Sequence, residues 1–152
     1  MGVFTTAAAV DVFFEDFEAV YVDEKYFSKP DCYFTDDKEM NLNLTILKRF
    51  SDNAQGSLNM LGLSMGEYVL PSGLDIEMKF CEMIDEALVM GPILKMLGIE
   101  SDNCPPVPGV YGSVNYKMDS TNFPDTFPPN NYMTIFTITN DDHIIFVTGE
   151  GE

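Results

Sequence analysis

Few side chains in this sequence have the type and spacing that catalysis requires. His143 is the only histidine, and no serine or cysteine motif accompanies it. A catalytic nucleophile needs a neighbouring base and a third group that orients that base. Without such partners, His143 fits an exposed structural position at the start of a strand. We therefore predict no catalytic residues and a protein that is not an enzyme.

The acidic side chains also lack the spacing of a metal or acid–base site. Adjacent carboxylates occur at Asp36-Asp37 and Asp141-Asp142, but in a chain with 25 acidic residues such pairs are commonly solvated turns. No EF-hand spacing is present, and one histidine without a Cys-x-x-Cys pair does not make a zinc site. No glycine-rich, phosphate-cradling loop occurs either. We expect no metal and no cofactor other than a bound hydrophobic ligand.

The three cysteines are the remaining reactive groups. Cys32, Cys81 and Cys104 give an odd count, so one thiol stays unpaired or pairs with another chain. Spacing alone does not choose the pair. Disulfides belong to oxidising compartments, and the glycosylation sequon at Asn43 points the same way, to a secreted protein. Three free thiols in a cytosolic protein are the alternative.

Composition limits the size and the partners of the protein. The 152 residues predict one domain, 1–152, and 45% hydrophobic residues suffice for a core and a lined pocket. The net charge of −17 argues against nucleic acid and against anionic membrane surfaces. No apolar run reaches the roughly 18 residues of a transmembrane segment. Residues 1–10 lack a basic leader region, so we expect that a secretion signal has been removed.

Alternating apolar and polar residues predict most of the elements. Leu42, Leu44 and Ile46 share one face of the segment 41–46, and Leu74, Ile76 and Met78 share one face of 74–80. Strands are also predicted at 12–22, 31–34, 57–65, 110–118, 132–139 and 143–148, the last two as a hairpin, with a proline-rich loop over 121–131. This pattern predicts an all-β sandwich or cup of roughly six to eight strands.

The period changes to a helical one at about 81–97. Gly91-Pro92 interrupts this insert, and Ile93, Leu94 and Leu97 crowd its second part. A short helix with so many apolar groups must cover something, so we predict a flap over the strands. Methionine suits an adaptable apolar lining, and the methionines placed in or beside the elements around the cup are Met60, Met65, Met78, Met90 and Met96.

The order of several short motifs resembles a known family. Phe80-Cys81-Glu82-Met83-Ile84-Asp85 is followed by Cys104-Pro105, Gly109-x-Tyr111, a proline-rich loop and Tyr132-x-Thr134-Ile135. This order resembles the ganglioside-activator proteins and the small secreted arthropod proteins related to them, within the immunoglobulin-like lipid-recognition domains. The resemblance covers residues 80–148 and implies a β-cup whose two sheets splay apart to hold acyl chains. It also implies a Cys81–Cys104 disulfide, which leaves Cys32 without an intrachain partner.

We expect a secreted protein that holds a lipid or another hydrophobic small molecule between two sheets, for transport or presentation. The residues predicted to line the cavity are Leu42, Leu44, Ile46, Leu58, Met60, Leu74, Ile76, Met78, Leu88, Ile93, Leu94, Leu97 and Phe136. The alternative is a structural or interaction protein with a packed core, which assembles through the apolar patch 88–97 or through Cys32. A protein receptor and a Cys32-linked homodimer are the macromolecular partners that the sequence leaves open.

Overall fold

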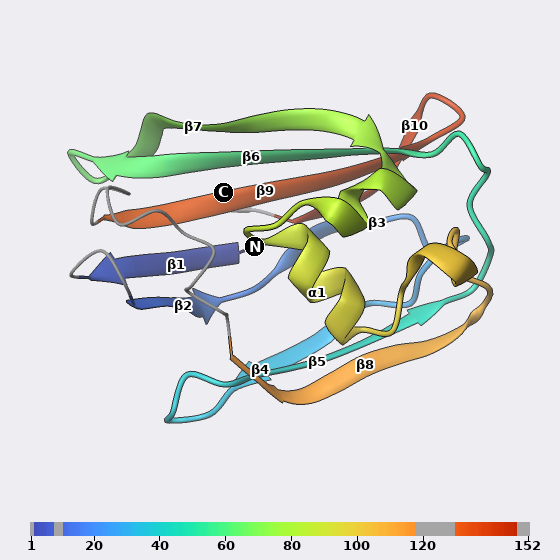
Figure 1. Ribbon diagram of the computed structural model, residues 1–152, viewed down its shortest axis with the longest axis horizontal. Helices are drawn as coiled ribbons and strands as arrows, with labels where there is room; N and C mark the ends of the chain where they lie inside the picture. Colours follow the sequence, from blue (N-terminus) through green and yellow to red (C-terminus); the bar gives the residue numbers. More distant parts are fainter. Residues whose placement is uncertain (1, 8–10, 118–129, 149–152) are drawn as a thin grey trace.

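Two antiparallel β-sheets face each other, with a helical segment between them (Figure 1). The computed structural model describes residues 2–7, 11–117 and 130–148. The predicted all-β sandwich is therefore confirmed. This described part holds ten strands, more than predicted. The excess arises at the start, where β1 (Gly2–Ala7), β2 (Asp11–Asp16) and β3 (Ala19–Val22) replace the single strand predicted at 12–22.

The large sheet has seven strands, and β9 (Asn131–Asn140) is its centre. One side of β9 pairs with β6 (Gln55–Ser64), and β7 (Glu67–Lys79) pairs with β6 as the outer strand. The other side of β9 pairs with β1 near its beginning and with β10 (His143–Thr148) near its end. β2 and β3 extend the sheet beside β1 and β10. The predicted β9–β10 hairpin is confirmed, while the loop predicted at 121–131 lies mostly outside the described residues.

The small sheet consists of β4 (Asp31–Phe34), β5 (Met40–Ile46) and β8 (Gly109–Tyr116), with β5 in the middle. The alternation along β5 has the predicted effect, because Leu42, Leu44 and Ile46 are buried. Asn43 is exposed on the opposite face. The small sheet thus presents a continuous apolar face to the interior.

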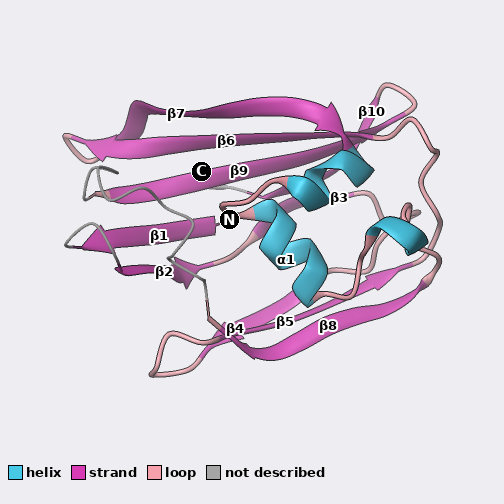
Figure 2. Cartoon of the chain, in the orientation of Figure 1, coloured by secondary structure: helices cyan, strands magenta, loops and turns pink. Residues whose placement is uncertain are grey.

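A helical segment joins the outer strand of the large sheet to the outer strand of the small sheet (Figure 2). It consists of η1 (Phe80–Asp85), α1 (Met90–Met96) and η2 (Ser101–Asn103), which confirms the predicted insert. The segment fills the gap between the β7 and β8 edges. Among the described residues, no helix has the length and apolar content to span a membrane.

Five phenylalanines connect the sheets through the interior. Phe50 packs against Phe27 and Phe80, with ring centroids 5.5 and 5.1 Å away. Phe146 packs against Phe27 at 5.0 Å and against Phe136 at 6.5 Å. These distances are typical of stabilising aromatic pairs. The cluster connects the loops beside the small sheet to β9 and β10 of the large sheet.

The β6–β7 hairpin carries Met65 away from the interior. Met65 and Gly66 have φ angles of 53° and 84°, as expected for a two-residue hairpin turn. The side chain of Met65 is fully exposed at this tip. Met65 therefore contributes nothing to the cup, because the turn geometry and not its apolar character decides its position.

Candidate functional site

An apolar cavity of about 60 Å³ lies between the two sheets and beneath α1. Leu42, Leu44 and Ile46 form its wall on the small sheet, and the five clustered phenylalanines, Phe27, Phe50, Phe80, Phe136 and Phe146, also line it. The roof comes from the helical segment and the residues beside it, namely Val89, Met90, Ile93, Leu94, Leu97 and Ile99. All three layers of the fold therefore meet at this cavity.

The structure brings together many of the predicted lining residues. Those that line the cavity are Leu42, Leu44, Ile46, Ile93, Leu94, Leu97 and Phe136. Leu58 and Met60 on β6 are fully buried in the same core, but they are not among the lining residues. Leu88 and the β7 residues Leu74, Ile76 and Met78 are only half buried against the core. The predicted alternation along β7 is correct. Because β7 is an outer strand, its inward face lies beside the cavity and not in its wall.

Sequence reasoning predicted Phe136 but missed the other aromatic residues of the lining. Phe27 lies in a turn and makes only an isolated bridge with Ile46, and Phe50 lies in the connection between β5 and β6. Neither residue belongs to an alternating segment, so periodicity gives no signal for them. Their size and full burial are the features that mark them, and these become visible only in three dimensions.

Two threonines are the polar exceptions among the described lining residues. Thr134 on β9 and Thr148 on β10 each have an exposed fraction of 3%. The Thr148 hydroxyl oxygen accepts a hydrogen bond from the backbone N–H of Phe136 at 3.0 Å. The Thr134 hydroxyl has no hydrogen-bond partner. None of the described lining residues carries a charge.

The cavity comes nearest to solvent at one side. Phe17 and Pro30 are partly exposed, whereas the other described lining residues are buried. Phe17 follows β2, and Pro30 precedes β4. The cavity therefore approaches the surface where the chain passes between the two sheets.

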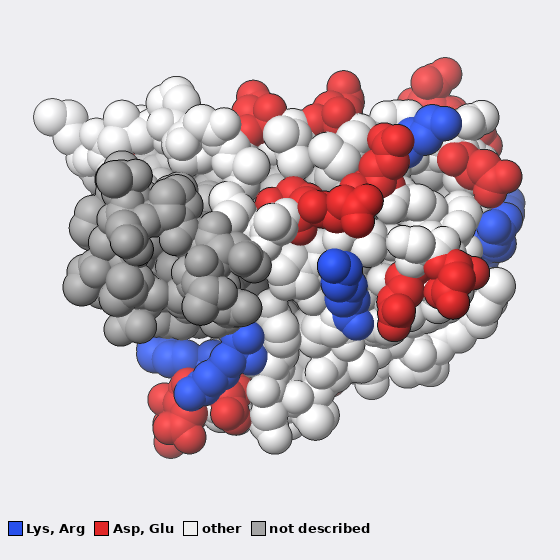
Figure 3. Space-filling model, viewed as in Figure 1, with Lys and Arg blue, Asp and Glu red and all other residues white. Residues whose placement is uncertain are grey.

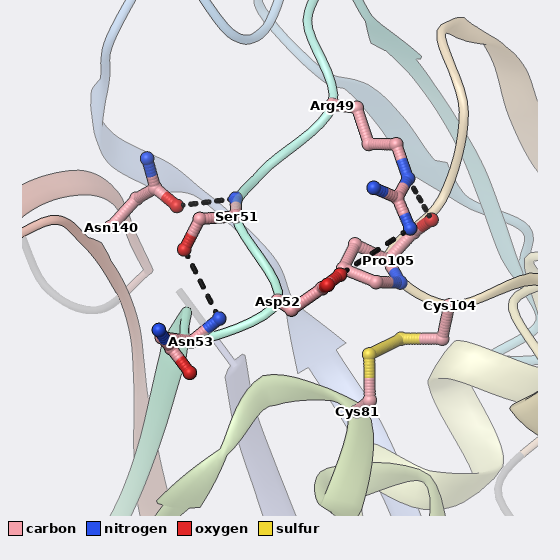
Figure 4. Close-up of polar contacts among 8 residues, drawn as sticks. All are labelled: Arg49, Ser51, Asp52, Asn53, Cys81, Cys104, Pro105 and Asn140. Atoms are coloured by element: carbon pink, nitrogen blue, oxygen red, sulfur yellow. Dashed lines mark hydrogen bonds and ion pairs between the residues drawn. A yellow bond between two sulfur atoms is a disulfide. The ribbon is translucent and has the colours of Figure 1, made fainter.

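A disulfide closes the helical segment into a loop with a clamped base. Cys81 and Cys104 are bonded, with 5.7 Å between their Cα atoms, as the family resemblance implied. Residues 81–104, which we call the flap, leave and return at this point. Beside it, the Arg49 Nε donates a hydrogen bond to the Pro105 carbonyl oxygen at 3.1 Å (Figure 4). The base of the flap is thereby attached to the connection between β5 and β6.

That connection is in turn attached to the large sheet. The backbone N–H of Ser51 donates to the Asn140 side-chain oxygen at 2.8 Å (Figure 4). Asn140 is the last residue of β9 and is itself buried. The clamped end of the flap thus rests on a framework that includes both sheets.

The apolar residues of the predicted patch 88–97 point inward. Val89, Met90, Ile93, Leu94 and Leu97 are buried on the inner side of the flap, while Lys95 is exposed. The patch therefore forms a roof over the core. A partner that used this patch would first have to displace the flap.

No protein-family model matches this chain, and no curated protein matches its sequence.

His143 and Asn43 are not among the residues that line the cavity. His143 is exposed at the start of β10. Within the described ranges, no three His, Cys, Asp or Glu side chains are placed to hold a metal ion. Asn43 is exposed on the outer face of β5, opposite Gly112 of β8.

Cys32 is free and half buried on β4. It pairs in register with Leu42 and packs against the core, while its neighbours Asp31 and Tyr33 are exposed. Burial raises the pKa of its thiol to about 12. Burial thus favours the protonated thiol over the thiolate, which is the reactive form of cysteine.

Proposed function

We propose that this protein binds a lipid or another hydrophobic small molecule between its two sheets, for transport or presentation, and that it does not catalyse a reaction. The observation that carries the proposal is an apolar cavity whose walls come from both sheets and from a disulfide-closed flap. Protein interiors are normally close-packed. At about 24 cal/mol per Å³, a void of about 60 Å³ costs roughly 1–2 kcal/mol of stability.

Binding requires the cavity to expand. Pockets that enclose drug-sized ligands measure roughly 300–1,000 Å³, whereas the cavity measures about 60 Å³. The flap is the part best suited to move, because its base is fixed at Cys81–Cys104 while α1 is held by side-chain packing. Outward movement of α1 would enlarge the space and keep the ligand beneath the same apolar residues.

Burial supplies enough free energy for such a ligand. Each methylene transferred from water contributes about 0.8 kcal/mol. A chain of about a dozen carbons therefore yields roughly 10 kcal/mol, from which the costs of ordering the ligand and moving the flap are subtracted. An uncharged lining that is almost entirely apolar is consistent with this kind of binding.

Export would suit such a carrier, and the disulfide supports it because disulfides persist in oxidising compartments. The exposed sequon at Asn43 is consistent with N-glycosylation on the same route. Acidic side chains gather over β7 and the flap, while the surface over β8 is uncharged (Figure 3). The strongly acidic surface keeps the carrier soluble when it is loaded.

Displacement of a fluorescent apolar dye, N-phenyl-1-naphthylamine, tests the proposal. The wild type is expected to bind the dye and to release it to long-chain lipids. Leu94→Phe places extra volume in the cavity wall and should weaken dye binding at least tenfold, while Val110→Phe, at a position on β8 that is 70% exposed, should not. Native mass spectrometry should show a bound hydrophobic molecule. A wild type that binds neither dye nor lipid would refute the proposed function.

A further inference from the structure

Thr134 combines burial, position and an unused hydroxyl. Its side chain is 3% exposed and lines the cavity, and its oxygen has no hydrogen-bond partner. Buried polar side chains almost always have a partner, and leaving one unsatisfied is costly. An unpartnered hydroxyl in an apolar wall is thus a vacant hydrogen-bonding position.

Thr134 lies where β9 changes its partner strand, and its hydroxyl has no hydrogen-bond partner. β9 pairs with β10 as far as Thr137, and with β1 from Thr134 towards the beginning of the strand. Between these two ladders, the N–H of Phe136 donates to the hydroxyl oxygen of Thr148, the last residue of β10, at 3.0 Å. Thr148 therefore has a structural role at this junction. Thr134 lies at the other side of the junction, and its hydroxyl has no hydrogen-bond partner.

The rest of the lining limits the charge of a ligand. None of the described lining residues is ionisable. Burying an ionised carboxylate without a cationic partner is strongly unfavourable. The net charge of −17 adds further repulsion. A neutral oxygen, in contrast, needs only one donor, which Thr134 supplies.

We propose that Thr134 donates a hydrogen bond to an uncharged oxygen of the bound lipid. The ligand class is then a neutral oxygenated lipid, such as a long-chain ketone, alcohol or ester, and not an ionised fatty acid. The oxygen lies against β9, and the hydrocarbon chain extends among the apolar residues under the flap. This inference rests on the proposed function and adds to it the chemistry and orientation of the ligand.

Three probes of equal chain length test the inference in the dye-displacement assay at pH 8: 2-dodecanone, dodecane and dodecanoate. The ratio of 2-dodecanone affinity to dodecane affinity should be about tenfold higher in the wild type than in a variant without the Thr134 hydroxyl, because the ketone oxygen leaves water and needs a donor in the cavity. Dodecanoate should bind more weakly than the ketone.

The variant Thr134→Val keeps the shape of the side chain and removes the hydroxyl. It should lower the ratio of 2-dodecanone affinity to dodecane affinity about tenfold and bind dodecane as the wild type does. Thr137→Val on the other face of β9, where the side chain is half exposed, is the matched control and should keep the wild-type ratio. The infrared carbonyl stretch of bound 2-dodecanone should lie at lower frequency in the wild type than in Thr134→Val.

The outcomes separate the two proposals. If the ratio of 2-dodecanone affinity to dodecane affinity is the same in the wild type and in Thr134→Val, or if dodecanoate binds best, the cavity binds apolar molecules but the role of Thr134 is wrong. The same holds if Thr134→Val and Thr137→Val behave alike. If none of the three probes binds, the proposed function fails and this inference fails with it.

Discussion

The carboxylate of Glu86 accepts a hydrogen bond from the backbone N–H of Met90, with 2.6 Å between Oε1 and the nitrogen. The same carboxylate accepts the N–H groups of Leu88 and Val89 at 2.7 and 2.8 Å. Helix starts leave such N–H groups without partners inside the helix. Val89 is the N-cap residue of α1, and its side chain makes no hydrogen bond to these N–H groups. One side chain therefore fixes how the flap turns into α1.

Replacing Glu86 should loosen the flap. Glu86→Ala removes all three hydrogen bonds and should lower the free energy of unfolding by about 1–2 kcal/mol. Urea denaturation measures this loss, and hydrogen exchange should show faster exchange in residues 88–97. Glu82→Ala, an exposed carboxylate in η1, is the control and should change stability by less than about 0.5 kcal/mol. Equal effects of the two substitutions would contradict the role of Glu86.

Gly91 is the position in α1 where a larger residue cannot fit. A Cβ atom there would lie 2.0 Å from the Glu86 carbonyl oxygen and 2.6 Å from that of Ile84. Both obstacles are backbone atoms, so α1 would have to shift. Gly91→Ala should therefore cost about 1–3 kcal/mol of stability in urea denaturation, although alanine favours helix. Lys95→Ala on the exposed side of α1 is the control, and a Gly91→Ala protein of wild-type stability would disprove this account.

Removing the disulfide should release the base of the flap. The bond closes a loop with a sequence separation of 23, for which the chain-entropy model gives about 3 kcal/mol. The double variant Cys81→Ala/Cys104→Ala should lose about that much free energy of unfolding and release a bound dye faster. Cys32→Ala should retain wild-type dye release at pH 7. Unchanged dye release in the double variant would show that the clamp does not control access to the cavity.

Cys32 should make stability depend on pH in the alkaline range. Burial raises the pKa of the folded thiol from 9.0 to about 12. Between these values the unfolded chain releases the proton while the folded protein keeps it, so stability falls as the pH rises above about 9. Urea midpoints at pH 8 and pH 10.5 should therefore decline more in the wild type than in Cys32→Ala. Parallel declines would show that this thiol is not desolvated in the fold.

The strands and the flap could be predicted because they depend on local patterns. The alternation around Leu42 and Leu44 gives the buried face of β5, and the clustered apolar residues at 93–97 give the roof. The role of Phe50 could not be predicted, because it packs across the interior from a loop. The splitting of the first strand was also missed. β1 exists because β9 offers it a partner edge, and that partner is distant in sequence.

The cavity lining likewise contains residues that local sequence patterns predict and residues that they do not. Neighbours in sequence revealed Ile93, Leu94 and Leu97, while Thr134 looked like an ordinary strand residue next to Phe136. Its importance comes from the change of partner along β9, which no local pattern encodes.

The central place of β9 also has a consequence for biosynthesis. β1 and β6 are made long before β9, yet both need it as a neighbour in the finished sheet. A nascent chain on the ribosome therefore exposes open strand edges until translation reaches residue 140. Such edges invite intermolecular pairing, so the yield of soluble protein should depend on chaperones during synthesis.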